Sequence, residues 1–223
     1  MKTPIIDIHT HKENAPEGVI AIRNFDWNET VTERGLYSVG VHPWNLDDDA
    51  FDWRHAMVQV TEKAANDGCI AIGEAGLDKV HKSSFGRQKE LFSQQVALSE
   101  TIGKPLVIHC VRSVNELLEF HKTLHPSQQW IVHGFNGSKE EVARLCADGI
   151  MLSVGESLMH SERKICGSLT AIPSESLFFE TDTSDIPITD VYCQAAMLLG
   201  TDLVTLTAEI FSNFVRIFHF KEI

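Results

Sequence analysis

Apolar and polar positions alternate in blocks along the chain. Short runs rich in β-branched residues are each followed by a longer stretch in which apolar residues recur every three or four positions. Several short runs lack period-two alternation, which is typical of strands buried on both faces of a parallel sheet. We expect strands at 4–9, 19–23, 35–41, 69–74, 105–110, 130–135, 149–155 and 177–182.

The longer stretches predict helices between the later strands. They cover 48–66, 85–102, 114–124, 139–147, 158–170, 188–199 and 203–219. Two of these helices begin with the pattern of a capping box, Ser113 with Glu116 and Ser138 with Glu141.

This alternation of strands and helices predicts an α/β protein with a TIM-type (β/α) barrel, formed by one domain over residues 1–223. A doubly wound open sheet is the alternative. It is less favoured because the chain has no G-x-G-x-x-G fingerprint.

The first connections are unusually short. Only seven residues separate His11 from Val19, whereas a parallel crossover usually needs about a dozen or more. The link from Arg23 to Gly35 is also too short for a comfortable helix. We therefore predict a barrel that is shortened near the N-terminus, without its first two helices and with an antiparallel second strand.

Composition narrows the class of protein. The 223 residues are 43% hydrophobic, which is enough for a full core. No run approaches the roughly 18 apolar residues of a membrane span, and no signal-peptide pattern opens the chain. The five cysteines are an odd number without a C-x-x-C pair, so we expect free thiols, a cytoplasmic location and no disulfide-linked partner. The net charge of −12 disfavours non-specific polyanion binding but leaves room for a local basic patch.

Metal-ligating side chains gather at the ends of the predicted strands. Asp7, His9 and His11 alternate on one strand face, because residues two apart point to the same side. The candidate ligands are His9, His11, Glu74, His109, His133 and Asp182. Carboxyl ends of barrel strands converge on one mouth, and imidazole with carboxylate suits divalent metals. Six ligands exceed the needs of one tetrahedral ion, so we predict two divalent ions (Mg, Mn or Zn) with Glu74 as the bridge.

The motifs resemble a known family. "DIHTH", "GVHPWN", "GEAGLD", "VIHC", "VHGFNGS" and "ETDTSD" follow the order of the TatD family of metal-dependent hydrolases, within the amidohydrolase superfamily. The resemblance covers nearly the whole chain. It implies that His9, His11, Glu74 and Asp182 hold one ion, that Glu74, His109 and His133 hold the other, and that Asp182 acts as general base.

The resemblance also implies a reaction. The family is most often described as 3′–5′ exonucleases, which implies a phosphodiesterase acting on DNA through water activated between two metals. A metal-dependent amide, ester or aminoacyl hydrolase on the same scaffold is the alternative, because a fold does not fix its substrate. A binding protein with a vestigial site is the third hypothesis, and the complete ligand set speaks against it.

Several further residues are candidates for contacts around the ligands. Asp7 either supports an imidazole or is a structural carboxylate, and His42 either touches substrate or packs. Arg112 is a candidate substrate contact. A possible basic rim for phosphate consists of Lys12, Lys79, Lys82, Arg112 and Lys139.

The chain departs from the family pattern near two of the ligands. The arginine usual two residues after the strand histidine is Val111, with Arg112 one place later. The proline and aromatic usual after "ETD" are replaced by Ser184, Asp185 and Ile186. These departures leave the ligands intact and bear on substrate identity. The sequence gives no expectation for the oligomeric state.

Overall fold

The computed structural model describes residues 3–31 and 35–220. The chain divides into two compact units, one formed by residues 1–23 with 133–223 and the other by residues 24–132. The expectation of a single domain over 1–223 stays a prediction.

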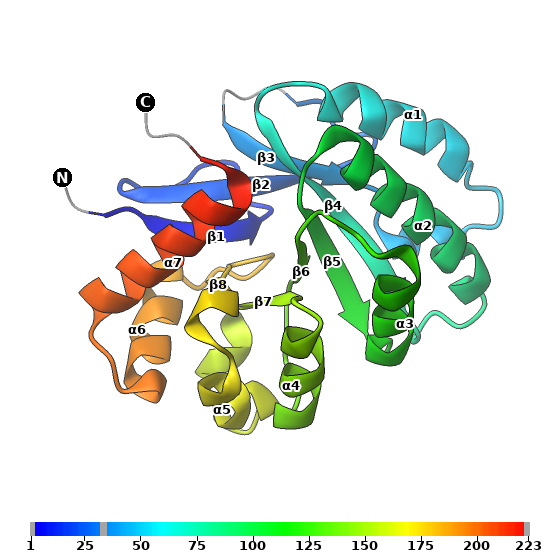
Figure 1. Ribbon diagram of the computed structural model, residues 1–223. Coiled ribbons are helices and arrows are strands. Elements are labelled where there is room, and N and C mark those ends of the chain that lie inside the picture. Colours follow the sequence, from blue (N-terminus) through cyan, green and yellow to red (C-terminus); the bar gives the residue numbers. More distant parts are fainter. Residues whose placement is uncertain (1–2, 32–34, 221–223) are drawn as a thin grey trace. The chain divides into compact units, whose positions relative to one another are not determined.

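The unit of residues 24–132 is a parallel sheet covered by helices. Its strands are β3 (Leu36–Gly40), β4 (Cys69–Asp78), β5 (Leu106–Val111) and β6 (Trp130–Val132), each paired in parallel with the next. Its helices are the short η1 (Pro43–Asp47), then α1 (Trp53–Ala64), α2 (Phe85–Ile102) and α3 (Val114–Leu124). Figure 1 shows α1 and α2 side by side against β3 and β4. Phe92 of α2 meets the ring of Trp130 at a centroid distance of 5.4 Å, which ties a helix to the sheet within the core.

The other unit contains the two ends of the chain. Its strands are β1 (Ile5–Thr10), the greater part of β2 (Val19–Asp26), β7 (Met151–Val154) and β8 (Leu177–Phe179). Its helices are α4 (Lys139–Ala147), α5 (Lys164–Ser168), α6 (Ile188–Leu199) and α7 (Leu203–Phe218), with short turns η2 (Glu156–Met159), η3 (Leu169–Ala171) and η4 (Ser174–Ser176). The helix α7 packs against β1 (Figure 1). Tyr192 of α6 fixes β1, since its hydroxyl donates to the carbonyl of Ile6 (2.9 Å) and accepts from its amide (3.2 Å).

The strand order is that of the chain, β1 through β8, and every strand pair for which the register is known is parallel. Helices separate the successive strands from β3 onward. This is the α/β topology of a TIM-type barrel, as predicted. Four helices, at 85–102, 114–124, 139–147 and 188–199, have the bounds expected from the sequence.

The prediction of an antiparallel second strand is wrong. The strand β2 runs parallel to β1, with Ile5 opposite Val19 and Asp7 opposite Ala21. The link 11–18 needs no helix to return, because at about 3.3 Å per extended residue it can pass the full length of a short strand. Gly18 in the left-handed region (φ 78°) then turns the chain into β2. The missing helices are confirmed, since the described part of the chain between β1 and β3 holds none.

Of the two predicted capping boxes, one is confirmed and one is wrong. The Ser138 side chain accepts from the amide of Glu141, whose side chain accepts from the amide of Ser138. The hydroxyl of Ser113 makes no cap bond and donates instead to the carbonyl of Leu77 in β4, at 2.7 Å. A long-range partner thus replaces the local one. The helix expected over 158–170 is divided into η2, α5 and η3.

Glycines allow β4 to approach its neighbours closely. A Cβ built on Gly76 would lie 2.0 Å from the carbonyl oxygen of His109, which is its partner in the β4–β5 register. A Cβ on Gly40 would lie 2.7 Å from the carbonyl carbon of Gly73. The glycines of "GEAG" therefore set the distance between the strand that carries Glu74 and the strand that carries His109.

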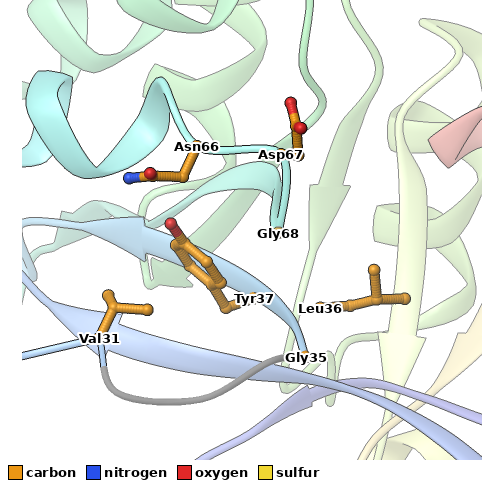
Figure 2. Close-up of a pocket in the computed structure, with 7 residues that line it drawn as sticks. All are labelled: Val31, Gly35, Leu36, Tyr37, Asn66, Asp67 and Gly68. Carbon is orange, nitrogen blue, oxygen red and sulfur yellow. The ribbon is translucent and has the colours of Figure 1, made fainter.

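A pocket opens at the amino ends of β3 and β4. It has a volume of about 600 Å³ and is lined by Val31, Gly35, Leu36, Tyr37, Asn66, Asp67 and Gly68. Figure 2 shows the ring of Tyr37 beside this pocket with its hydroxyl directed toward α1, where it donates to the carbonyl of Lys63 at 2.8 Å. Glu74, the candidate ligand on β4, lies five residues beyond the first residue of that strand, Cys69, so the pocket is separate from it.

All five cysteines are free thiols. Within residues 3–31 and 35–220, no single helix has the length and apolar composition needed to cross a membrane, and α6 and α7 meet these criteria only as a pair bent by 108°.

Replacing Gly76 by alanine should destabilise the protein and disturb His109. The added methyl group overlaps the His109 carbonyl, and overpacking of this kind costs about 1–3 kcal/mol. Urea denaturation should show this loss for Gly76→Ala. Gly86→Ala is the matched control, because a Cβ there meets no atom within 4 Å and alanine is the better helix former by about 0.5–1 kcal/mol. Equal stability of the two variants would contradict the close approach.

Candidate metal-binding clusters

Three ligand candidates of the unit formed by 1–23 and 133–223 lie together. His9, His133 and Asp182 each offer a ligand atom, and these atoms lie within 4.8 Å of one another. An Asp182 carboxylate oxygen is 3.7 Å from Nε2 of His9 and 3.5 Å from Nε2 of His11. His9 is fully buried, whereas the His11 and Asp182 side chains are partly exposed. We call His9, His11, His133 and Asp182 the first cluster.

Backbone contacts hold Asp182 beside the end of β1. Its amide donates to the carbonyl of His9 (2.9 Å), and its carbonyl accepts from the amide of His11 (3.1 Å). Asp182 is in the left-handed region (φ 50°), which few non-glycine residues adopt. Backbone strain of this kind concentrates at functional sites, where the surroundings enforce it.

Asp7 supports this segment rather than an imidazole. Its carboxylate accepts from the amide of Thr181 (3.0 Å) and from the Thr181 hydroxyl (2.7 Å). Burial raises the pKa of Asp7 to about 7, although the bonds from Thr181 act in the opposite direction. Of the two interpretations of Asp7 that the sequence left open, these contacts favour the structural carboxylate.

Glu180 orients His133. It is buried, and one of its carboxylate oxygens lies 3.3 Å from Nδ1 of His133 while accepting from the amide of Gly134 at 2.6 Å. Burial alone would raise the pKa of Glu180, but the His133 and His9 imidazoles lower it below its usual value. A carboxylate beside Nδ1 requires the N–H there, so the lone pair of His133 is on Nε2.

A second cluster lies in the unit of residues 24–132 and consists of His42, Glu74 and His109. One Glu74 carboxylate oxygen is 3.1 Å from Nε2 of His42 and 3.1 Å from Nδ1 of His109. The two ring nitrogens are 3.4 Å apart. Glu74, expected at the end of its strand, lies instead within β4 between Gly73 and Gly76, because the strand continues to Asp78. His109 lies near the end of β5, and His42 follows β3.

Asp78 holds His109 from the other side. Its carboxylate oxygen is 3.1 Å from Nε2 of His109 and also accepts from the indole N–H of Trp44 at 2.9 Å. Burial acts to raise the pKa of Asp78, but the bonds from Trp44 and His109 outweigh it and lower the value. With its proton on Nε2, His109 turns the lone pair of Nδ1 toward Glu74.

His42 has the opposite arrangement. Its Nδ1 accepts from the backbone amide of Trp44 at 3.2 Å, as the N-cap of η1. A neutral imidazole has one lone pair, so Nε2 of His42 carries the proton and donates to Glu74. His42 therefore faces Glu74 as a hydrogen-bond donor and not as a ligand.

The donor set fits a divalent cation. The lone pair of His109 Nδ1 faces a Glu74 carboxylate oxygen, and a cation stabilises two acceptors that face each other. In tetrahedral coordination with bonds of about 2.0–2.1 Å, neighbouring ligand atoms are about 3.3–3.4 Å apart. The spacing is 3.1 Å between Glu74 and His109, and 3.5 and 3.7 Å between Asp182 and the two β1 imidazoles.

The predicted basic rim is only partly available to a substrate. Lys79 forms an ion pair with Glu116, and Lys12 donates to the carbonyl of Ile186 at 3.4 Å. Lys82, Lys139 and Arg112 are exposed. Arg112 directly follows Val111, the last residue of β5, and is in the left-handed region (φ 52°).

Three residues that support the ligands were not predicted from the sequence, namely Asp78, Glu180 and Trp44. Period-two spacing could have indicated two of them, because Asp78 lies four residues after Glu74 on the same strand and Glu180 lies two residues before Asp182. Nothing in the sequence pairs them with particular histidines. Trp44 is part of the quoted "GVHPWN", but its contact with Asp78 depends on the fold.

Comparisons with known proteins find relatives that are named metal-dependent hydrolases and exonucleases. A relative from Haemophilus influenzae, named an uncharacterized metal-dependent hydrolase, is 24% identical over 76% of this chain and 69% of its own length. A relative from Pectobacterium atrosepticum, named the 3′–5′ ssDNA/RNA exonuclease TatD, is 29% identical over 65% of this chain. The chain spans only 56% of the length of that exonuclease.

Solved structures and a family model extend the likeness to the whole chain. The crystal structure of YjjV, a TatD homologue from Escherichia coli, superposes with a TM-score of 0.84 at 21% identity and covers 99% of this chain and 100% of its own. The model of the TatD-related DNase family matches residues 6–219. The resemblance expected from the motifs is confirmed, and the chain belongs to the TatD-related DNase family of metal-dependent hydrolases.

Proposed function

We propose that this protein is a phosphodiesterase that removes nucleotides from the 3′ end of DNA and depends on two divalent metal ions. The observation that carries the proposal is the carboxylate–histidine pairing in both clusters. Asp78 directs a lone pair of His109 toward Glu74, and Glu180 leaves a lone pair on Nε2 of His133. Metal-ligating histidines are oriented in this way by a carboxylate behind them.

The ligand roles follow the family pattern. In that pattern His9, His11 and Asp182 would hold one ion, His109 and His133 would hold the other, and Glu74 would be a ligand of both. A set of imidazole and carboxylate ligands can bind Mg, Mn or Zn, so it does not identify the metal. When bound, such a pair lowers the pKa of water and takes up charge that develops on a phosphoryl oxygen.

Asp182 is proposed as the general base. Its side chain is 40% exposed, whereas that of Glu74 is only 7% exposed. A base must reach both water and the substrate, and Asp182 has this access while its backbone is fixed on His9 and His11. Glu74, which is buried against two imidazoles, is suited to holding cations.

His42 and Arg112 are proposed to contact the substrate. Because Nδ1 of His42 accepts from the Trp44 amide, its Nε2–H is a donor; it donates to Glu74 here and would exchange this partner for a phosphate or leaving-group oxygen when substrate binds. Arg112 is exposed one residue beyond β5 and can form the bidentate contact that suits phosphate. Lys82, which is exposed in the same unit, is a third candidate for a contact with phosphate, after His42 and Arg112.

The alternative is a metal-dependent amide, ester or aminoacyl hydrolase. One observation favours it: two of the five rim cations, Lys79 and Lys12, are engaged by Glu116 and by the carbonyl of Ile186. Fewer cations for phosphate in a chain of net charge −12 weaken binding of a polyanion. The departures at Val111, Ser184, Asp185 and Ile186 lie close to the ligands and are consistent with either substrate.

A substrate panel separates the two activities. Single-stranded DNA with a free 3′ end, aryl esters and aryl amides are each incubated with the Mn²⁺-loaded enzyme and with enzyme treated with chelator. We expect release of 3′ nucleotides that is abolished by chelator and restored by metal. A 3′-phosphorylated oligonucleotide is the control and should react more slowly. Turnover of esters or amides without turnover of DNA would overturn the nuclease proposal and support the alternative.

Asp182→Asn should separate catalysis from metal binding. The amide keeps a ligand oxygen but cannot accept a proton, so turnover should fall by about 10²–10⁴-fold, the range for general acid–base catalysis. Metal content by plasma mass spectrometry should stay near that of the unmodified protein. His109→Ala should lose metal and activity together, because it removes the lone pair that faces Glu74.

Two results would contradict this assignment. If Asp182→Asn loses metal as completely as His109→Ala, Asp182 is chiefly a ligand. If it keeps both metal and near-normal turnover, Asp182 is not the base. Glu209→Gln, an exposed change on α7, is the matched control and should alter neither quantity.

A further inference from the structure

Trp44 is unusually exposed for an indole that is already hydrogen-bonded. It is 53% exposed, although its N–H donates to the buried carboxylate of Asp78 at 2.9 Å. A tryptophan with a purely structural role usually buries its ring in the core, where its N–H also finds a partner. Here the N–H is satisfied and the ring surface faces solvent.

The indole is held in one orientation. Asp78 is 2% exposed, and its other carboxylate oxygen accepts from the amide of Val80 at 2.8 Å. The backbone amide of Trp44 donates to His42, and Pro43 stiffens the first turn of η1. An aromatic ring that is fixed before binding loses little conformational entropy when a ligand packs on it.

The surroundings of the ring belong to the second cluster. The ring centroid of Trp44 is 4.8 Å from that of His42 and 5.9 Å from that of His109, both edge to face. The ring of His81, anchored by Asp47, lies 5.3 Å away and is tilted by only 33° from the indole plane. Trp44 and His81 thus form a small aromatic surface next to Glu74 and His109.

We propose that Trp44 is a stacking surface for the base of an unpaired nucleotide and so determines substrate specificity. This inference rests on the proposed phosphodiesterase function and adds to it a residue that determines specificity by contacting the base. A base is joined to its phosphate by one sugar, so a base stacked on Trp44 places its phosphate near the second cluster. Stacking tolerates every base, because each has a π-face, but a base within a duplex is covered by its neighbours.

Trp44 also acts on His109 through Asp78, and the test must separate this positioning role from stacking. Trp44→Phe keeps a ring and loses the N–H, whereas Trp44→Leu loses both. Each variant is assayed on two single-stranded oligonucleotides that differ only at the 3′ end, one with a normal nucleotide and one with an abasic analogue. Trp53→Leu is the matched control, since it removes an indole from α1 in the same unit.

Stacking predicts a loss that depends on the base. For Trp44→Leu, kcat/KM on the normal end should fall about 5- to 150-fold, the range for removing one stacking ring, and mainly through KM. On the abasic end it should stay within about 3-fold of the unmodified protein. Trp44→Phe should keep most of the preference for the normal end. An equal loss of kcat/KM on both ends, or no loss on either, would overturn the proposal.

A binding measurement tests the same surface without turnover. The intrinsic fluorescence of the metal-loaded protein is titrated with deoxyadenosine monophosphate and with deoxyribose 5-phosphate. We expect the nucleotide to bind at least 5-fold more tightly, and we expect this difference to vanish in Trp44→Leu while Trp53→Leu keeps it. If the protein cleaves neither oligonucleotide, this base preference would support stacking while the phosphodiesterase proposal fails. Equal binding of the two ligands would overturn stacking whatever the activity.

Discussion

The candidate site depends on where each imidazole carries its single proton. A neutral histidine offers one lone pair, and the partner of its other nitrogen decides which nitrogen has it. Asp78 accepts a hydrogen bond from Nε2–H of His109, and Glu180 accepts one from Nδ1–H of His133. The backbone amide of Trp44 donates to the lone pair on Nδ1 of His42. Two histidines are thereby prepared as ligands and the third as a donor.

The backbone makes these partners meet. Gly76 lets β4 lie close enough to β5 for Glu74 to reach His109. In the other unit, Asp7 holds Thr181, and the next residue, Asp182, takes a left-handed conformation against the end of β1. The cost of burying Asp7 and of straining Asp182 is of the kind that proteins retain where chemistry requires it. The close approach at Gly76 orients the carboxylate of Glu74, and the contacts of Asp7 with Thr181 orient that of Asp182.

Much of the fold was predictable because its signals are local. The apolar runs gave the strands, and the helices at 85–102 and 188–199 end at glycines 103 and 200, both in the left-handed region. The Ser138 capping box is complete within four residues. The direction of β2 was not predictable by counting linker residues, because the segment 11–18 crosses back without a helix.

The candidate ligands were predictable from the sequence, but the residues that hydrogen-bond to these ligands were not. The six ligand candidates lie at or near the ends of the strands predicted from the sequence, and these predicted ends are visible as local patterns. Which carboxylate lies behind which ring depends on contacts across strands, such as Asp78 with His109. The same reason explains the failed box at Ser113, whose hydroxyl has its partner on β4, 36 residues away in the sequence. A local sequence pattern cannot show whether a side chain will bond to a neighbouring residue or to one that is distant in the sequence.

The most direct test is a crystal structure of the Mn²⁺-loaded protein with anomalous diffraction. We expect metal bonded to Nδ1 of His109 and to Nε2 of His133, with the Asp78 and Glu180 carboxylates still hydrogen-bonded to the opposite ring nitrogens. We also expect that His42 is bonded to no metal. Metal on Nε2 of His42, or on the ring nitrogens that face Asp78 and Glu180, would contradict this expectation.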